Sequence, residues 1–399
     1  MPIPNCKLPD PAVLYKELAH DGIAIYIREA CEYLTGGDAK SCINHLNRAV
    51  AKDVASPWGW IVAATAHCQL GNYKMAIEIS NKGLRYSGDN SHLFDCLGVA
   101  HAGLGDLATA QHHFHKAIHT NPHNSNSIVN LTNVHLAQQA IDTAFKVIEQ
   151  GLQKNPDHAE IRHLYIQLHP AWASTLENER IRIRPRTAQD DPFIMACYAN
   201  QHFMNNYNRY LADTFRQSKS STNPDFKNRL NVYKNKCIQW IIEKTNHTAP
   251  STCKTMPIGL ASLAAIEISH RRAEILLGFP DTRFNGSGIP LTAMLMIMDF
   301  AFNTIGFNKL TSIVYATNER AQKSTLALGF KQEGFFKKHL FDHKLNIWLD
   351  TYQNGILAEE FRSNIQLVKL STRLMKTHLN LTQPRSLFSK LDSTKNPTD

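Results

Sequence analysis

The chain has 399 residues, a formal net charge of +9 and 43% hydrophobic residues, which is enough for two or three domains with cores of their own. No stretch reaches the roughly 18–20 apolar residues that cross a bilayer, and residues 1–22 lack the features of a secretory signal. The eight cysteines are scattered without a C-x-x-C pair, which favours reduced thiols over disulfides or a metal site. We expect a cytoplasmic protein with no metal and no membrane contact. We also expect no nucleic-acid partner, because the basic residues form no dense patch.

The first half of the sequence repeats itself every 34 residues. Bulky residues, glycines and alanines each recur in a column of their own: Trp60, Phe94 and Ile128; Gly37, Gly71 and Gly105; Ala76, Ala110 and Ala144. In each unit a bulky residue of a first helix can pack onto small residues of a second helix, and the glycine permits the turn between them. One unit cannot bury its own apolar face, so we expect the units to stack into a superhelix.

This spacing and residue set resemble the tetratricopeptide repeat family, most closely at QLGNYKMAI (69–77). We expect an N-terminal segment over 1–22 and helical repeats over 23–170, which include four units and a capping helix near 158–168. The resemblance implies that the concave face of the array binds a protein partner or a second copy of the chain.

The region after the repeats mixes strand and helix patterns. IRIRPRTAQDDPF (181–193) predicts a strand and then a helix that begins near Pro192. Residues 257–279 predict two strands joined by a turn. We expect helices around 193–216 and 226–245, and a polar loop at 217–225.

A turn with two glycines leads directly into an apolar helix over 289–306. The first N–H groups of a helix have no partner within it, and the helix dipole adds positive potential, so this turn can bind an anion. Glycine lets the main chain approach phosphate oxygens closely. The residues before the helix therefore predict a diphosphate site: Arg283, Phe284, Asn285, Gly286, Ser287 and Gly288.

Three motifs of this region occur in the order seen in the GNAT acyltransferase superfamily, which the region resembles. They are R-x-x-G-x-G at 283–288, the strand pattern that ends at Asn318, and LGFKQEGF (328–335). The resemblance implies an α+β domain over 178–360, with a mixed, mostly antiparallel sheet flanked by helices. The expected fold is therefore multidomain, an all-α superhelix followed by this domain. Over 361–399 we expect a basic amphipathic helix and then a disordered tail from Gln383. The apolar stripe of this helix consists of Phe361, Ile365, Val368, Met375 and Leu379.

The resemblance implies direct transfer of an acyl group, most often acetyl, from CoA to a primary amine. Nucleotide-amino-sugar and ribosomal-protein N-terminal acetyltransferases look most similar, so the acceptor is an amino sugar or other small amine, or a protein N-terminus. Residues implied to bind the acyl-CoA are Leu277, Gly278, Phe279, Arg283, Phe284, Asn285, Gly286, Ser287, Gly288, Ile289 and Asn318.

A carboxylate usually deprotonates the amine in such a reaction, directly or through water. Glu274 is the first candidate for this base and Glu267 the second. The family's usual general acids are replaced here by Ala321 and Thr325, so Ser324, Thr325 or water would protonate the leaving thiolate. Two alternatives remain open: a scaffold whose GNAT domain binds CoA without turnover, and a partner-binding module that acts through its repeats alone.

Overall fold

The computed structural model describes residues 4–8, 24–50, 57–207, 228–245, 256–342, 345–375 and 386–392. It divides into two compact units, Met1–Tyr165 and Ile166–Asp399, which are considered separately. The polar loop expected at 217–225 lies outside the described residues. None of the described helices is long and apolar enough to cross a membrane.

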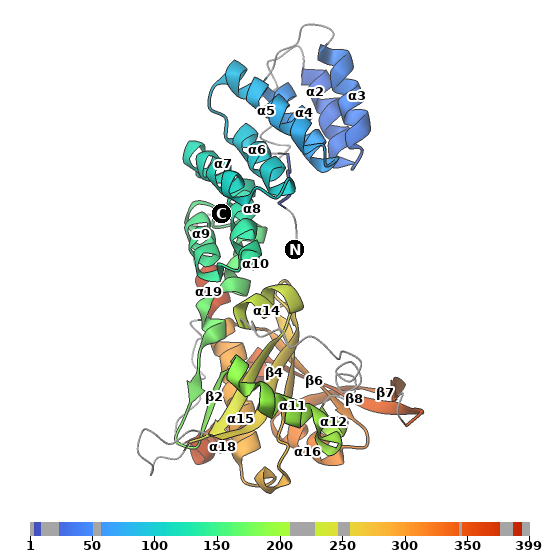
Figure 1. The fold of residues 1–399 in the computed structure, drawn as a ribbon. Coiled ribbons are helices and arrows are strands. Elements are labelled where there is room, and N and C mark those ends of the chain that lie inside the picture. Colours follow the sequence, from blue (N-terminus) through green and yellow to red (C-terminus); the bar gives the residue numbers. More distant parts are fainter. Residues whose placement is uncertain are drawn as a thin grey trace. The chain divides into compact units, whose positions relative to one another are not determined.

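The first unit is built from helices that pack in consecutive pairs (Figure 1). They are α2 (Ala24–Thr35), α3 (Ala39–Val50), α4 (Pro57–Gln69), α5 (Tyr73–Ser87), α6 (Ser91–Gly103), α7 (Leu107–Thr120), α8 (Ser125–Ala137), α9 (Ile141–Lys154) and α10 (Ala159–Leu168). Small residues allow the close approach within a pair, because a Cβ added at Gly83 would lie 2.8 Å from Trp60 Cβ, and one added at Gly151 would lie 2.4 Å from Ile128 Cγ2. The repeated columns therefore predicted the packing of bulky against small residues.

The turns inside the pairs adopt positive φ. Gly37, Gly71 and Gly105 have φ of 85°, 74° and 86°, which glycine tolerates because it has no Cβ. The fourth turn places Gln139 at the equivalent position with φ of 61°. The geometry of the turn is thus kept in a unit that has lost its glycine.

The second unit contains an eight-stranded sheet in the order β1-β2-β3-β4-β5-β6-β8-β7. Its strands are β1 (Leu176–Glu177), β2 (Ile181–Pro185), β3 (Ile238–Lys244), β4 (Met256–Glu267), β5 (Arg272–Gly278), β6 (Lys309–Tyr315), β7 (Lys331–Asp342) and β8 (Ile347–Leu357). Only β5 and β6 pair in parallel, and every other neighbouring pair is antiparallel. The predicted fold, helical repeats followed by a mixed, mostly antiparallel sheet with helices, is confirmed.

The sheet opens between β5 and β6. These strands pair only from Arg272 with Lys309 to Glu274 with Thr311, after which both continue without pairing to each other. Helices of the second unit lie against the sheet (Figure 1). They include α11 (Asp191–Ala199), α12 (Gln201–Tyr207), α15 (Ile289–Asp299) with its π-helical extension η5 (Phe300–Ile305), and α16 (Glu319–Ala327).

The helix predicted over 226–245 is wrong in its second half. Helix α14 (Asn228–Asn235) ends before Lys236, which has φ of 51°, and β3 follows. Ile238, Trp240 and their neighbours in β3 are buried on both faces between β2 and β4. A short apolar run rich in β-branched and aromatic residues fits such a central strand, and burial on both faces removes the alternation that marks most strands.

The C-terminal stripe is also corrected. The helix breaks at Asn364, whose side chain accepts the N–H groups of Gln366 and Leu367 at the start of α18 (Ile365–Met375). The break shifts the helical phase, so Ile365 is 70% exposed and Leu367 is buried instead. Leu379 lies outside the described residues.

Two further expectations about helix limits need correction. The helix expected at 193–216 is divided at Asn200 into α11 and α12, and residues 208–216 lie outside the described residues. Disorder from Gln383 is wrong for 386–392, where α19 (Leu387–Asp392) buries Leu387, Phe388 and Leu391.

Candidate active site

The turn before α15 and the first turn of this helix present backbone N–H groups that have no partner among the described residues. Gly286 and Gly288 have φ of 82° and 80°, and Gly288 is the N-cap of the helix. No described residue accepts a hydrogen bond from the N–H of Gly286, Gly288 or Leu291. Together with the dipole of α15, these groups form an anion site of the kind that the sequence predicts.

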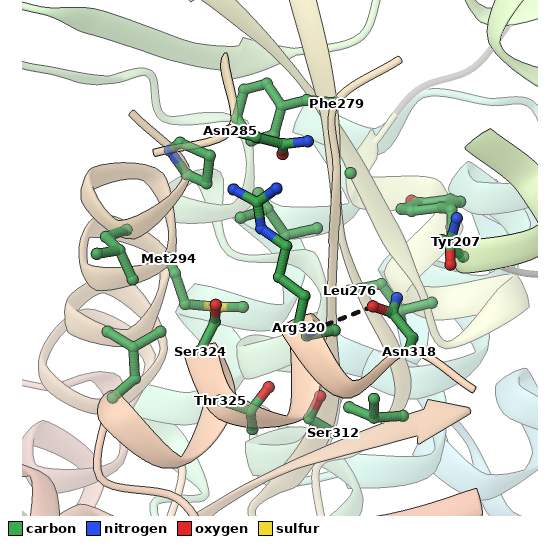
Figure 2. Close-up of a pocket in the computed structure, with 18 of the residues that line it drawn as sticks. Tyr207, Leu276, Phe279, Asn285, Met294, Ser312, Asn318, Arg320, Ser324 and Thr325 are labelled. Atoms are coloured by element: carbon green, nitrogen blue, oxygen red, sulfur yellow. Dashed lines mark hydrogen bonds between the residues drawn. The ribbon is translucent and has the colours of Figure 1, made fainter. Parts of the chain in front are cut away.

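A cavity of about 870 Å³ extends from this turn into the opening between β5 and β6. Its wall is formed by residues of α12, β5, the turn 285–288, α15, β6, α16 and α18. Leu276, Phe279 and Met294 contribute apolar surface, whereas Tyr207, Asn318 and Ser324 contribute polar groups (Figure 2). A long ligand with an anionic end and an apolar or neutral middle fits this distribution.

Three arginines lie along the cavity or beside the turn 285–288. Arg320 and Arg373 line the cavity, and Figure 2 shows the Arg320 side chain extending from α16 toward Asn285. The Arg180 guanidinium donates to the Ser287 carbonyl at 2.8 Å and lies 3.2 Å from the position of a Cβ at Gly288. The Arg180 and Arg320 guanidinium groups add positive charge beside the turn, which favours phosphate oxygens.

Most of the residues implied to bind acyl-CoA line this cavity. They are Leu277, Gly278, Phe279, Asn285, Gly286, Ser287, Gly288 and Asn318. Asn318 also caps α16, because its side-chain oxygen accepts the Ala321 N–H at 3.1 Å.

Arg283, Phe284 and Ile289 are not among the lining residues. The Arg283 side chain is 89% exposed and forms an ion pair with Asp281 at 2.6 Å. This ion pair raises the pKa of Arg283 and lowers that of Asp281. Phe284 packs against Phe279, and Ile289 is buried in the first turn of α15.

The two candidate bases differ in their surroundings. Glu274 is half-buried at the last pair between β5 and β6, and burial raises the pKa of its carboxyl, although a hydrogen bond from the Ile313 N–H opposes this. Ile313 lines the cavity, whereas Glu274 itself does not. Glu267 instead pairs with Arg272 at 2.8 Å, which holds its pKa below the usual range, and it does not line the cavity.

Both candidate acids lie on α16 and line the cavity, Ser324 exposed and Thr325 buried. Sequence reasoning missed Arg320, Arg373, Arg180 and Tyr207. The Tyr207 hydroxyl lies 3.1 Å from Ser262 Oγ, and burial raises the pKa of this phenol. Of these four, only Arg320 carried a local signal, because it follows the cap residue Asn318 at the start of a helix.

Residues 180–331 match the acetyltransferase (GNAT) domain family, and residues 101–168 match the tetratricopeptide repeat family. A tetratricopeptide repeat region precedes a GNAT acetyltransferase domain in this chain. The chain is 24% identical over 169 residues to an uncharacterized N-acetyltransferase of Bacillus subtilis, with 42% of this chain and 89% of that protein covered. It is 30% identical over 120 residues to a spermidine N(1)-acetyltransferase of Escherichia coli, with 29% of this chain and 64% of that enzyme covered.

Among solved structures, the chain is similar to a spermidine N-acetyltransferase of Vibrio cholerae in complex with CoA and spermine. The identity is 19% and the TM-score 0.36, and the match covers 46% of this chain and 99% of that chain. The GNAT domain is that of an N-acetyltransferase, and enzymes of this family use acyl-CoA.

Proposed function

We propose that the GNAT domain transfers an acetyl group from acetyl-CoA to a primary amine by direct attack of the amine. The observation that carries the proposal is the set of N–H groups at Gly286, Gly288 and Leu291, which have no partner among the described residues and border a cavity of about 870 Å³. Acetyl-CoA supplies the activated thioester for this reaction. The residues of this chain bind it, orient it and move protons.

The anionic end of the ligand would be held by the turn 285–288. The N–H groups of Gly286 and Gly288, with that of Leu291 in the first turn of α15, can each donate to a phosphate oxygen, and positive φ at Gly286 and Gly288 keeps side chains away from the ligand. Arg320 and Arg373 would balance the charge. Arg180 fixes the turn through the Ser287 carbonyl.

The reacting carbonyl would be polarised by main-chain groups of β5. In the described part of the sheet, the edge of β5 that faces β6 has no strand partner beyond Glu274. Leu277 and Gly278 therefore offer fixed backbone dipoles to the cavity. Such preorganised donors contribute several kcal/mol to transition-state stabilisation.

Proton transfer is assigned to Glu274, acting through water that reaches it past Ile313. Burial raises its pKa toward the range in which a carboxylate is an effective base near neutral pH. Ser324 or Thr325 would return a proton to the thiolate, and water can replace them because a thiol has a pKa of about 8.5.

The acceptor is proposed to be an amino sugar or another small amine, or a protein N-terminus. The named relatives from Escherichia coli are spermidine acetyltransferases. However, the described lining of the cavity contains no Asp or Glu, so it offers no carboxylate for the second ammonium group of a polyamine. We therefore rank a monoamine above spermidine. The cytoplasmic location remains a proposal that rests on the scattered cysteines.

The test is release of free CoA thiol from acetyl-CoA with glucosamine 6-phosphate, a nucleotide amino sugar, spermidine and a free N-terminal peptide as acceptors. Gly286→Asp should abolish CoA binding measured by calorimetry, because its carboxylate repels phosphate. Gly37→Asp is the matched control, since Gly37 has a similar φ and open surroundings in the other unit. If the protein binds CoA without releasing thiol with any amine, the scaffold alternative replaces this proposal.

A further inference from the structure

The segment Pro4–Leu8 lies in extended form across the face lined by the first helices of consecutive pairs. It contacts α4, α6, α8 and α10. Its side chains alternate, because Cys6 is 2% exposed whereas Asn5 and Lys7 are exposed. This alternation is typical of an extended peptide with one side against a surface.

Side-chain amides of the helices hold the main chain of the segment. Asn130 Oδ1 accepts the Asn5 N–H at 3.1 Å, and Asn130 Nδ2 donates to the Asn5 carbonyl at 3.1 Å. Gln69 donates to the Cys6 carbonyl and Asn126 to the Lys7 carbonyl. These bonds recognise a backbone in extended form and depend little on the side chains of the bound segment.

The amide of Asn130 is held in place from behind. Its Nδ2 also donates to Asp95 Oδ1 at 3.1 Å, and Ser127 Oγ donates to the same oxygen at 2.8 Å. Asp95, Ser127 and Asn130 are all buried. The buried carboxylate therefore fixes which end of the Asn130 amide donates and which accepts, so the amide is oriented to pair with a peptide.

A small pocket receives the Cys6 side chain. Cys6 Sγ lies 3.1 Å from Cys96 Sγ and 3.5 Å from Thr65 Oγ1, and Cys68 belongs to the same buried cluster. Leu8 packs against the neighbouring apolar cluster of α2, α3 and α4. Lys7 pairs with Glu160 at 2.8 Å, but both side chains are about half exposed. The pocket thus selects a small side chain at the central position.

We propose that this face is a groove for an extended peptide, and that the chain's own Pro4–Leu8 occupies it as an internal competitor. The partner that fits is a protein segment with a small residue at the Cys6 position and an apolar residue two positions later, read mainly through its backbone. A partner of this kind binds by displacing Pro4–Leu8. The proposal is independent of the acetyl-transfer function.

The test is fluorescence anisotropy with a labelled peptide of residues 2–10 and the full-length protein. An internal segment competes at an effective concentration of about millimolar, so the wild-type protein should bind the peptide weakly. In Cys6→Glu the new carboxylate would be buried beside Asp95, which expels the internal segment. This variant should bind the free peptide at least tenfold more tightly than the wild type does.

Two controls identify the groove. Adding Asn130→Ala to Cys6→Glu should weaken peptide binding about tenfold, because two hydrogen bonds are lost. A peptide with Lys7→Ala should bind within about threefold of the original, since the ion pair with Glu160 is exposed. A peptide with Cys6→Phe should not bind, because the pocket is too small.

A second variant designed to free the groove replaces residues 2–8 by a Gly-Ser segment of equal length and introduces no charge. This variant and Cys6→Glu are called the release variants. Helical melting curves are measured for both release variants. Tight peptide binding by either folded variant supports the proposal. It is overturned if both variants melt like the wild type and bind no more peptide. It is also overturned if both lose the cooperative melt, because the segment is then part of the repeat core.

Discussion

The Glu274 carboxylate accepts a hydrogen bond from the Ile313 N–H, across the point where β5 and β6 stop pairing. The bond links the base candidate on one strand to a residue that lines the cavity on the other strand. Burial still raises the pKa of Glu274, so the site combines a restrained carboxylate with increased basicity.

Glu274→Gln should lower kcat with the preferred amine by about 100-fold, the usual contribution of a general base. The base must be ionised to act, so wild-type activity should fall as the pH drops through the raised pKa of Glu274. The activity of Glu274→Gln should not fall in this way as the pH drops. Steady-state thiol release between pH 5 and 9 provides the measurement.

Glu267→Gln is the matched control for this prediction. Its carboxylate pairs with Arg272 outside the cavity lining, so its kcat should stay within about threefold of the wild type. Equal losses in both variants would show that removing either charge disturbs the strands and would argue against Glu274 as the base.

Arg320 and Arg283 should respond differently to substitution. Arg320→Ala should raise the KM for acetyl-CoA about tenfold or more, because a charge-assisted hydrogen bond is lost. Arg283→Ala should change KM less than threefold, since the Arg283 side chain is 89% exposed and paired with Asp281. Initial rates at varied acetyl-CoA give both constants. A larger effect at Arg283 would indicate that Arg283, the residue that the sequence motif favoured, contacts the phosphates instead of Arg320.

The difference between these arginines shows which parts of the candidate site can be predicted from the sequence. The turn 285–288 and the cap Asn318 could be predicted because their chemistry is local, set by glycines and by the start of a helix. Arg373 and Arg180 come to the cavity from segments far away in the chain, and no spacing in the sequence indicates this. The contact of Glu274 with Ile313 likewise requires the parallel pairing of β5 and β6.

The same limit applies to the fold. A 34-residue period predicted the helical pairs because each unit repeats the same contacts. In the second unit, β3 is buried on both faces, so its sequence does not show the alternation of apolar and polar residues that marks most strands. The apolar stripe after Phe361 was misplaced because a single cap at Asn364 restarted the helix and shifted its phase.

The fourth turn of the repeat array offers a stability test. Gln139 adopts φ of 61°, and a left-handed conformation costs a residue with a Cβ about 1–2 kcal/mol. Gln139→Gly relieves this cost, although the glycine gives up about 0.5–1 kcal/mol in chain entropy. The variant should be more stable by about 0.5–1 kcal/mol in urea unfolding.

Gly105→Gln is the reverse change at the equivalent turn, where φ is 86° and a Cβ would meet open space. It should destabilise the repeats by a similar amount. A loss of stability in Gln139→Gly would mean that contacts of the Gln139 side chain outweigh the backbone strain.

The buried Asp95 predicts a pH dependence of stability. Burial raises its pKa to about 6 from an ordinary value of 3.8, although Ser127 and Asn130 donate hydrogen bonds to it. Between these two values the folded state binds one proton more than the unfolded state, so the free energy of unfolding decreases as the pH rises. The loss is complete above the folded pKa and amounts to about 3 kcal/mol.

Asp95→Asn keeps the shape of the side chain and removes the charge. It should be more stable than the wild type at pH 8, and the difference should shrink on acidification and vanish below about pH 4. Asp38→Asn should show the opposite dependence. Asp38 accepts the Ser41 N–H and its pKa is lowered, so this variant loses stability at neutral pH and recovers it in acid. Thermal melts from pH 2 to 8 measure both. A constant difference across pH for Asp95→Asn would mean that its carboxylate does not titrate abnormally in the folded protein.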